Sequence, residues 1–192
     1  IGLTFVRNPA IAAIKNIIAS GQLGKVLHFS GNYWADYSSD PMSPISWRYK
    51  GGQGTGALAD VGSHISYVAE FITGKPFSAV SGARFVTSIT ERPVPSGAVQ
   101  GHSAAAASDK FEAVENDDYA GFVADFGGVA GAIQVSRVAA GHPTSLEFEV
   151  YCEKGAARFS QARNGEFELL LNQDPYSQRG FRTIQVGPSH PY

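Results

Sequence analysis

The residues best placed to do chemistry lie in one short stretch, residues 51–64, with the sequence GGQGTGALADVGSH. Its glycines would form a loop in which a ligand can approach the backbone closely. The apolar second half carries Asp60 and His64 four residues apart, a spacing that an α-helix places on one face. An imidazole titrates near neutral pH, and a neighbouring carboxylate stabilises its protonated form. The stretch therefore predicts an acid–base site, with His64 as the group that exchanges a proton.

Two simpler interpretations of Asp60 and His64 stay open at this point. An aspartate and a histidine at this spacing commonly form an ion pair on a helix surface. The pair could also begin a metal site, but such a site needs a third and a fourth ligand. The remaining histidines show no supporting spacing, so we predict no metal site; they are His28, His102, His142 and His190.

Residues 52–57 formally match the G-x-G-x-x-A pattern of dinucleotide-binding loops. That pattern binds a pyrophosphate only where an apolar strand leads into the tight turn and a helix N-terminus faces the phosphates. The preceding residues, 44–50, read PISWRYK and form a polar, proline-containing segment. We therefore predict no nucleotide-binding domain within these 192 residues.

Two helices are expected to position the stretch. Asn8 and Pro9 form a helix start, and apolar residues at intervals of three and four continue that helix for about three turns. The second helix is expected over residues 57–72. A strand over residues 25–34 and a proline-containing loop over residues 35–50 lie between the two helices.

From residue 77 onward the pattern is that of β-strands. Gly127 and Gly128 indicate a two-residue hairpin turn, and residues 88–116 are expected to be a long mobile excursion. The expected fold class is α+β, an open-faced, mainly antiparallel β-sheet of about six or more strands with helices on one face. The expected strands are residues 77–86, 119–126, 129–138, 146–152, 156–160, 167–171 and 181–186.

Several of these strands carry apolar residues on both faces, as in Ala130, Ala132, Ile133 and Val135. Helices on one face only would leave half of these residues exposed to water. We therefore expect a second subunit on the open face of the sheet, and hence a homo-oligomer.

Composition excludes several classes of partner. The net charge is −2 and no basic block occurs, so neither nucleic acid nor an anionic membrane surface is an expected partner. No apolar run approaches the ~20 residues that span a bilayer. The single cysteine, Cys152, fits a reducing compartment and therefore a cytoplasmic protein. The first residue is Ile1 rather than Met, and residues 1–6 resemble the end of a strand, so we expect a fragment of a longer protein.

At the level of whole motifs, residues 51–64 resemble the signature of the C-terminal domain of the Gfo/Idh/MocA family, which includes glucose–fructose oxidoreductase and inositol dehydrogenase. The resemblance extends from residue 2 to about residue 171 and is specific as a set of segments. Besides residues 51–64, it rests on RNPA at 7–10, IASGQLGKV at 18–26, WR at 47–48, NDDY at 116–119, VSR at 135–137 and EKG at 153–155.

The resemblance implies an NAD(P)-dependent oxidoreductase that acts on a sugar, a polyol or an inositol-like compound. Residues 1–192 would be its C-terminal substrate-binding and oligomerisation domain. An N-terminal Rossmann domain, absent from this chain, would bind most of the NAD or NADP and carry a catalytic lysine in a Lys-Pro pair. The chain alone would be inactive.

The resemblance also implies roles for single residues. His64 would be the general acid–base group, and Asp60 would orient the substrate hydroxyl and tune His64. Trp47 and Arg48 would contact the substrate, and Arg7 the cofactor, with Asn8 and Tyr33 as weaker candidates for the same cleft.

Simpler roles stay open for most of these residues. Trp47 would otherwise anchor a loop, Arg48 would be a surface charge, and residues 7–8 would do no more than cap a helix. For the whole chain, the alternative is a non-catalytic carbohydrate-binding, sensor or dimerisation module on the same scaffold. An upstream Lys-Pro pair in the full-length protein would favour the enzyme.

Overall fold

The computed structural model describes residues 2–51, 54–97 and 106–190. Its two α-helices are α1 (Pro9–Ala19) and α2 (Ser63–Thr73). The strands of these residues are β1 (Val26–Trp34), β2 (Ala79–Val86), β3 (Glu91–Pro95), β4 (Ala107–Ala113), β5 (Tyr119–Asp125), β6 (Ala130–Ser136), β7 (Ser145–Cys152), β8 (Gly155–Ser160), β9 (Glu166–Leu171) and β10 (Arg182–Gln185). Short helical turns are η1 (Thr4–Arg7), η2 (Trp47–Tyr49), η3 (Leu58–Gly62), η4 (Gln161–Arg163) and η5 (Tyr176–Gln178).

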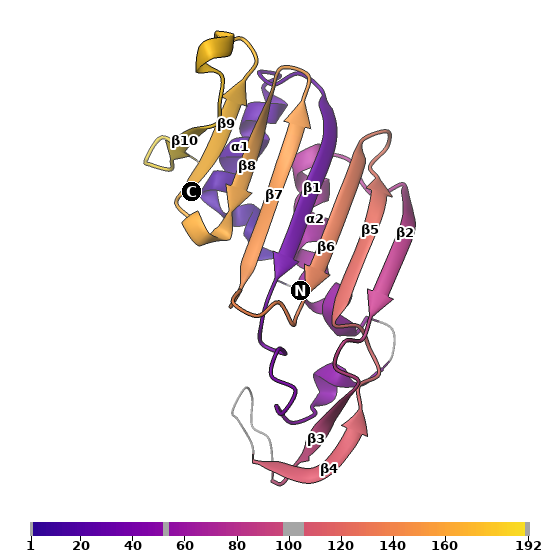
Figure 1. The fold of residues 1–192 in the computed structure, drawn as a ribbon. Coiled ribbons are helices and arrows are strands. Elements are labelled where there is room, and N and C mark those ends of the chain that lie inside the picture. The colour runs from indigo at the N-terminus through magenta and orange to yellow at the C-terminus, as the bar shows by residue number, and fades with distance from the viewer. Residues whose placement is uncertain (1, 52–53, 98–105, 191–192) are drawn as a thin grey trace.

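Eight strands form one sheet in the order β10-β9-β8-β7-β1-β6-β5-β2, and both helices lie against one of its faces (Figure 1). Neighbouring strands in the described residues are antiparallel except β1 and β6, which run parallel. The remaining strands, β3 and β4, form a separate antiparallel hairpin, called the arm below. The structure confirms the predicted α+β class and the open-faced, mainly antiparallel sheet.

Helix α1 begins where the sequence predicts. The Asn8 side chain accepts hydrogen bonds from the backbone amides of Ala10 (2.8 Å) and Ile11 (3.3 Å), and Pro9 stands at the start of the helix. Ile11 and Ile14 are fully buried in the core. A side-chain cap of this kind stabilises a protein by about 1 kcal/mol, which gives Asn8 a structural role that needs no ligand.

The sheet order contains one feature that local pattern does not predict. Strand β1 comes early in the chain but lies between β6 and β7, so the connection from β6 to β7 passes the end of β1 and is not a hairpin. The hairpin between β5 and β6 is confirmed. Gly127 and Gly128 both have positive φ, and the Phe126 amide donates to the Val129 carbonyl at 2.8 Å. Local turn chemistry is readable from sequence, whereas insertion of a distant strand is not.

The expectation of a mobile excursion over residues 88–116 is wrong, because most of its described residues form the arm. Glu91 pairs with Ala113 and Pro95 with Ala107 across the two strands. Proline is tolerated in a two-stranded hairpin because each strand has one edge that pairs with nothing. Part of the expected excursion lies outside the described residues, namely Gly101, Ala104 and Ala105.

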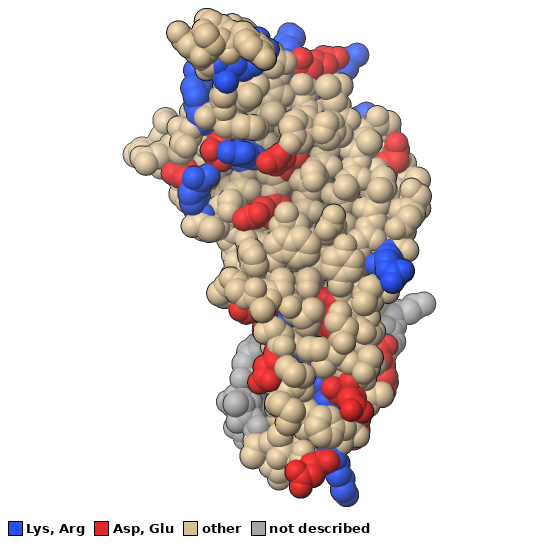
Figure 2. Space-filling view, viewed as in Figure 1, with Lys and Arg blue, Asp and Glu red and all other residues tan. Residues whose placement is uncertain are grey.

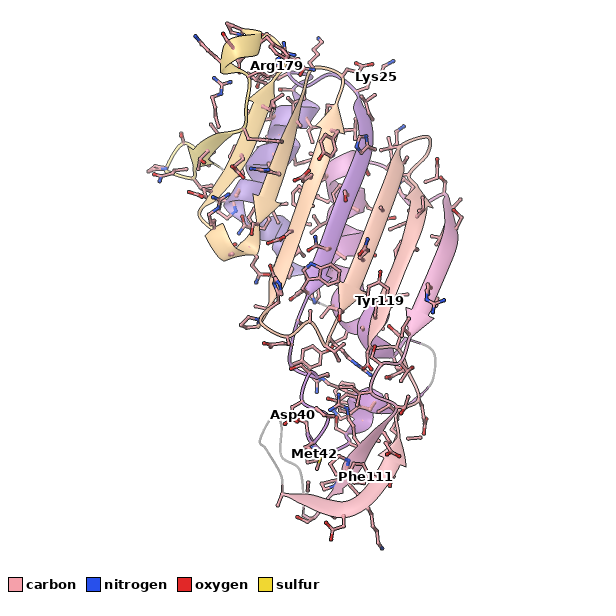
Figure 3. All side chains as sticks on the ribbon, viewed as in Figure 1. Lys25, Asp40, Met42, Phe111, Tyr119 and Arg179 are labelled. Atoms are coloured by element: carbon pink, nitrogen blue, oxygen red, sulfur yellow. The ribbon has the colours of Figure 1, made fainter. Side chains whose placement is uncertain are left out.

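Arg92 attaches the arm to the loop that follows β1. Its side chain is fully buried and donates to the backbone carbonyls of Asp40 (2.7 Å) and Ser38 (2.5 Å). Asp40 and Met42 accordingly lie beside the arm, which carries Phe111 (Figure 3). The arm and this loop therefore form one packed unit beyond the end of the sheet.

The core lies between the sheet and its two helices. Phe29, Ile65 and Ile133 are 0–1% exposed within it. Gly31 on β1 lies so close to α2 that a Cβ atom there would stand 2.8 Å from Cδ1 of Ile65. This close contact fixes α2 on the sheet, and with it the residues at the N-terminal end of the helix.

The open face of the sheet has two different halves (Figure 2). Charged side chains gather over β7, β8 and β9, where the guanidinium of Arg158 donates to Glu168 at 2.6 Å and lies 3.8 Å from Glu149. Over β5 and β6 the surface carries small and apolar side chains, including Val123, which is 53% exposed. Strand β6 carries apolar residues on both faces of the sheet, as expected. Ala130 and Ala132 lie on the open face, while Ile133 and Val135 are fully buried beneath the helices.

Candidate active site

A cavity of about 460 Å³ lies between η2, the glycine-rich loop and η3. It brings together three of the predicted site residues, Trp47, Arg48 and Asp60. Gly52 and Gln53 of the same loop lie outside the described residues. The full lining consists of Trp47, Arg48, Gly54, Thr55, Gly56, Ala59, Asp60 and Arg137.

The cavity offers one flat aromatic wall and three charged side chains, of which Arg137 is almost completely buried. Trp47 is 73% exposed, and the Arg48 guanidinium lies over its ring at 4.5 Å from the centroid. Arg48 Nε is also 4.0 Å from Oδ2 of Asp60. An apolar wall beside a few convergent polar groups is the usual construction of a small-molecule site, and hydrogen-bonding hydroxyl groups suit both a guanidinium and a carboxylate.

Asp60 does not lie in a regular α-helix, so the prediction of one continuous α-helix over residues 57–72 is wrong in its first turns. Residues Leu58–Gly62 form the π-helical turn η3, and the α-helix begins at Ser63. The hydroxyl group of Tyr37 donates to Oδ2 of Asp60 at 2.5 Å. Burial and the bond to Asp60 raise the pKa of Tyr37 far above its ordinary value, so Tyr37 stays a donor.

His64 lies in the first turn of α2 and is half-buried. Its ring packs against the rings of Phe5, at 5.4 Å between centroids, and Tyr33, at 6.0 Å. Its Nδ1 atom is buried without a hydrogen-bond partner. Burial lowers the pKa of His64, and the charge of Asp60 opposes that shift without reversing it. His64 is therefore held as a neutral imidazole outside the lining of the Trp47–Asp60 cavity.

The three weaker site candidates, Asn8, Tyr33 and Arg7, do not line the cavity. The side chains of Asn8 and Tyr33 form hydrogen bonds within the fold. The Asn8 side chain caps α1 and donates to Asn164 at 2.6 Å. Tyr33 is buried, with its hydroxyl group 2.9 Å from Oγ1 of Thr144. Arg7 is an exposed residue at the end of η1 and does not line the cavity.

Residues 115–118, between the arm and β5, hold the parts of the cavity in place. Asn116 donates from its amide to the carbonyls of Arg48 (2.9 Å) and Lys50 (3.0 Å), which fixes η2. Glu115 accepts from the amide of Gly51 at 2.7 Å, which fixes the start of the glycine loop. The sequence alone predicts no role for these residues, although NDDY at 116–119 is part of the resemblance.

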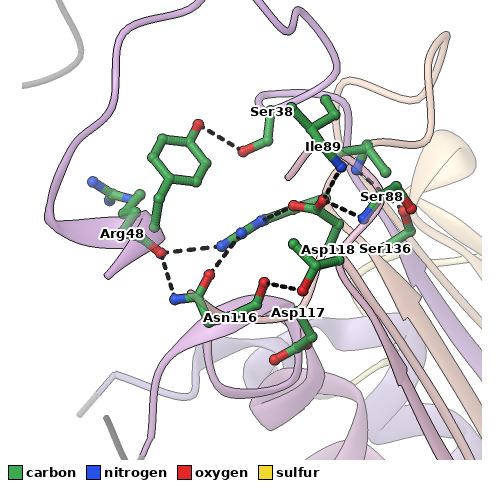
Figure 4. Close-up of polar contacts among 12 residues, drawn as sticks. Ser38, Arg48, Ser88, Ile89, Asn116, Asp117, Asp118 and Ser136 are labelled. Atoms are coloured by element: carbon green, nitrogen blue, oxygen red, sulfur yellow. Dashed lines mark hydrogen bonds and ion pairs between the residues drawn. The ribbon is translucent and has the colours of Figure 1, made fainter. Parts of the chain in front are cut away.

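A buried ion pair completes this framework (Figure 4). Arg137 is 1% exposed, and its guanidinium donates to Asp118 at 2.8 Å, to Asn116 at 2.7 Å and to the carbonyl of Arg48 at 3.1 Å. The same guanidinium lies over the Tyr49 ring, 4.8 Å from its centroid. Arg137 is the residue directly after strand β6. Its side chain therefore connects the end of β6 to η2, the turn that carries Trp47 and Arg48.

Asp117 caps the start of η3 from a distant part of the chain. Its carboxylate accepts from the Leu58 amide at 2.9 Å, and its backbone carbonyl accepts from the Ala57 amide at 2.9 Å. Gly56 makes room for this cap, because a Cβ atom there would stand 2.0 Å from Oδ1 of Asp117. A helix start that lacks a local capping residue is therefore capped across 59 positions of sequence.

This arrangement predicts that Gly56→Ala destabilises the protein more than Gly54→Ala. Both glycines have positive φ, so both variants carry backbone strain, but only a Cβ at position 56 displaces Asp117. We expect the free energy of unfolding of Gly56→Ala to be lower by about 1–2 kcal/mol than that of Gly54→Ala. Urea denaturation measures it, and equal values for the two variants would contradict the role given to Asp117.

The described residues do not fit the phosphates of a dinucleotide. The glycine loop follows the turn η2 and not a strand, and the helix start beyond it is already capped by the carboxylate of Asp117. A phosphate at that position would face a negative charge instead of free amide groups. The helix start beyond the glycine loop therefore does not suit the phosphates of a dinucleotide, whereas the charged groups of the cavity suit a hydroxylated small molecule.

Two features are absent from residues 2–51, 54–97 and 106–190, namely a cluster of metal-binding side chains and a membrane-spanning helix. No three side chains of His, Cys, Asp or Glu come together there in a way that could hold a metal ion. No helix in the same residues is long and apolar enough to cross a membrane.

Comparisons with known proteins agree with this fold. Levoglucosan dehydrogenase from Pseudarthrobacter phenanthrenivorans is 34% identical over an alignment 195 residues long that covers 100% of this chain and 50% of that protein. The solved apo form of levoglucosan dehydrogenase has a TM-score of 0.89 at 35% identity and covers 98% of this chain and 48% of that chain. Its complex with NADH and levoglucosan has a TM-score of 0.84 at 34% identity, over 98% of this chain and 47% of that one.

The chain thus spans about half the length of these relatives. A family model, the GFO/IDH/MocA C-terminal domain, matches residues 11–158, a range that contains η2, the glycine loop, α2 and most strands of the sheet. The match confirms the resemblance carried by residues 51–64 and their companion segments. The chain belongs to the Gfo/Idh/MocA family, in which it corresponds to the C-terminal domain.

Proposed function

We propose that this chain is the substrate-binding part of an NAD(P)-dependent oxidoreductase that oxidises a hydroxyl group of a sugar, polyol or inositol-like compound. The observation that carries the proposal is the cavity in which Trp47, Arg48 and Asp60 converge, with His64 one helical turn beyond Asp60 in the chain. Relatives that include levoglucosan dehydrogenase, solved with NADH and levoglucosan, support the substrate class and the cofactor.

His64 acts as the general base in this proposal. Its Nδ1 atom is buried without a partner, which leaves Nε2 as the nitrogen that receives the proton of the substrate hydroxyl. Burial favours the neutral ring that a base requires. Asp60 and Arg48 bind neighbouring hydroxyl groups, and Trp47 covers the apolar side of the substrate.

The cofactor is bound mainly by an N-terminal Rossmann domain outside residues 1–192. NAD or NADP supplies the hydride acceptor of the reaction. The residues described above position the substrate and move its proton, so the chain alone is inactive. Arg7 stays a candidate for a cofactor contact, because it ends the turn whose Phe5 packs on His64.

The open face of the sheet is proposed to contact a second copy of the protein. Its small and apolar half over β5 and β6, with Val123 53% exposed, is the part most easily buried. The proposed location is the cytoplasm, in keeping with the single buried and unpaired cysteine.

Activity against a panel of hydroxyl compounds tests the proposal. Full-length protein is incubated with NAD or NADP and with aldoses, anhydrosugars, linear polyols and inositols, and the absorbance of the reduced nicotinamide is followed. Substrate-dependent reduction is expected with at least one compound. Sugar binding without any reduction would instead favour the alternative, a non-catalytic carbohydrate-binding or sensor module, especially if the upstream Lys-Pro pair is missing.

The lowered pKa of His64 predicts where kcat/KM falls at acid pH. Burial lowers the pKa of His64, so the base stays unprotonated as the pH falls through the ordinary histidine range. The acid limb of kcat/KM for the full-length enzyme should therefore lie below the ordinary pKa of histidine, about 6.5. The Asp60→Asn variant should move that limb to still lower pH, because the Asp60 charge raises the pKa of His64. A limb above the ordinary value in wild type would contradict this assignment.

A further inference from the structure

A second cavity, of about 480 Å³, lies on the open face of the sheet over β1, β7, β8 and β9. It shares no lining residue with the candidate active site. Three carboxylates and two guanidinium groups line it. Both guanidinium groups are already engaged on the β9 side, because Arg158 donates to Glu168 at 2.6 Å and Arg163 donates to the same carboxylate at 2.9 Å. The opposite side of the cavity, over β1 and β7, is left without a cation.

Two acceptors on that side lack a charged donor. Glu147 accepts from the hydroxyl groups of Ser145 (3.2 Å) and Ser160 (2.9 Å), and none of the ion pairs in the described residues includes it. Oδ1 of Asn32 is buried and has no hydrogen-bond partner. A buried acceptor without a donor is costly and therefore uncommon in folded proteins. Asn32 and Glu147, called the socket below, thus form a place for a cationic donor.

Arg84, on the edge strand β2, has the chemistry that the socket lacks. It pairs in register with Gly121, and its neighbour Phe85 pairs with Ala120, which is buried beneath the helices. Successive side chains of a strand point to opposite faces, so Arg84 lies on the open face. Its side chain is exposed and forms no hydrogen bond or ion pair with any described residue.

Arg84 and the socket stand in one row across the sheet. The strand pairings give this row as Arg84, Gly121, Gln134, Asn32 and Glu147. Within one chain, β2 is separated from β1 by β5 and β6, and β7 follows β1. At the usual spacing of neighbouring strands, Arg84 is about 14–19 Å from the socket of its own chain. An arginine side chain is too short to close that distance.

A second copy of the chain brings the two together. Two open sheets that pack face to face as identical copies are related by a two-fold axis in the plane between them. An axis parallel to the strands over β5 and β6 keeps each row in place and exchanges β2 with β1 or β7. The small and apolar half of the face then packs on itself, and the charged side chains over β8 and β9 lie beyond the partner's edge strand, in water (Figure 2). An axis across the strands would instead place β2 over β2, and Arg84 near Arg84.

We propose that Arg84 of each copy docks into the socket of a second copy, between Asn32 and Glu147, across a two-fold axis that runs along β5 and β6. The proposal rests on the open-face contact of the proposed function and adds its axis and its recognition points. Packed sheets lie about 10 Å apart, a gap that an extended arginine side chain spans. The guanidinium donates to the free oxygen of Asn32 and pairs with the carboxylate of Glu147.

Charge reversal in the full-length protein tests the contact, with the mass of the assembly followed by analytical ultracentrifugation. Arg84→Glu sets two carboxylates against each other, and Glu147→Arg sets two guanidinium groups against each other. Each variant should weaken self-association at least about tenfold, because close charge pairs contribute strongly at protein interfaces. The matched control is Lys154→Glu, in the exposed turn between β7 and β8. It changes the net charge as Arg84→Glu does and should associate like the wild type.

A mixture of the two variants is the decisive measurement. In the mixed dimer, both contacts pair a carboxylate with a guanidinium, whereas each variant alone has two like-charge contacts. Native mass spectrometry of an equal mixture should therefore show mixed dimers almost exclusively, with the wild-type Kd. A contact within one chain cannot produce this result. Random mixing of the two variants, or self-association of each at wild-type strength, would overturn the proposal.

A milder substitution keeps the test decisive if Glu147→Arg does not fold. Asn32→Asp adds a charge at the socket with almost no change in shape. It should strengthen self-association in the wild type and not in an Arg84→Gln background, because only the guanidinium gains from the added carboxylate. Equal effects in the two backgrounds would contradict the contact.

Assembly is measured independently of turnover. Val123→Glu, in the small and apolar half of the face, should also weaken self-association. If Val123→Glu dissociates the assembly and the charge reversals do not, the open-face contact stands and the proposed axis fails. If the wild-type protein does not self-associate, both fail, and the panel of hydroxyl compounds still decides the proposed reaction.

Discussion

Full-length protein with the substitution His64→Ala should lose turnover by about 10²–10⁴-fold, the contribution that a positioned general base makes. Its affinity for NAD or NADP should stay at the wild-type value, because in the proposed function the cofactor is bound mainly by an N-terminal domain outside residues 1–192. Steady-state kinetics measures the first quantity and calorimetry the second. The folded structure should persist, since the ring is only half-buried and its Nδ1 atom has no hydrogen-bond partner.

The control for this substitution is His142→Ala. His142 is exposed in the connection between β6 and β7, and its loss should change kcat by less than twofold. Normal turnover in His64→Ala would remove His64 from the mechanism, and would leave Asp60 and the lysine expected in the N-terminal domain as candidates for proton transfer.

The largest expected loss of stability follows from Arg137→Leu. This variant leaves the buried carboxylate of Asp118 without its ion-pair partner and removes one of the two donors to the carbonyl of Arg48, of which Asn116 is the other. Breaking a buried pair in this way costs about 3–5 kcal/mol, which is a large part of the stability of an ordinary domain. Urea denaturation of the full-length protein should show the loss in the transition of this domain. Arg137→Lys should not restore the stability, because lysine cannot reproduce the forked contacts to Asp118 and Asn116.

Arg158→Leu is the matched control. Arg158 also forms a close ion pair, at 2.6 Å from Glu168, but its side chain is 39% exposed. Solvent screening limits exposed pairs to about 0–1 kcal/mol, so this variant should remain close to the wild type. Similar losses for the two arginines would show that the network around Arg137 does not hold η2. A raised KM for substrate in Arg137→Lys would be the functional sign that η2 has shifted.

The sequence predicted those features of the molecule that are encoded locally. Asn8 and Pro9 specify the start of α1 through a cap that spans three residues. Gly127 and Gly128 specify a turn because few other residues adopt positive φ at both positions. Two helices followed by a series of strand-like segments were enough to indicate an α+β sheet with helices on one face. The composite motif of residues 51–64 led to the family and to the neighbourhood of the site.

The features that the sequence did not predict depend on contacts between distant segments. Asp117 caps η3 from 59 positions away, and β1 enters the sheet between strands that follow it by about a hundred residues. No local pattern distinguishes the π-helical turn from the α-helix that contains the same residue types. From the sequence alone, Arg92 and Arg137 would be expected on the surface. Only the folded chain shows the carbonyl and carboxylate groups that accept their hydrogen bonds in the interior.

The central claim is that a carbon-bound hydrogen of a hydroxyl compound leaves as hydride beside Asp60 and His64. The most direct measurement uses the best substrate of the full-length protein, labelled with deuterium on the carbon that bears the reacting hydroxyl group, and mass spectrometry of the reduced nicotinamide. We expect one deuterium atom in the nicotinamide of the wild-type reaction, and formation of the deuterated cofactor about 10²–10⁴-fold more slowly in His64→Ala. Reduced cofactor without deuterium, or no reduced cofactor from any compound of the panel, would contradict the claim.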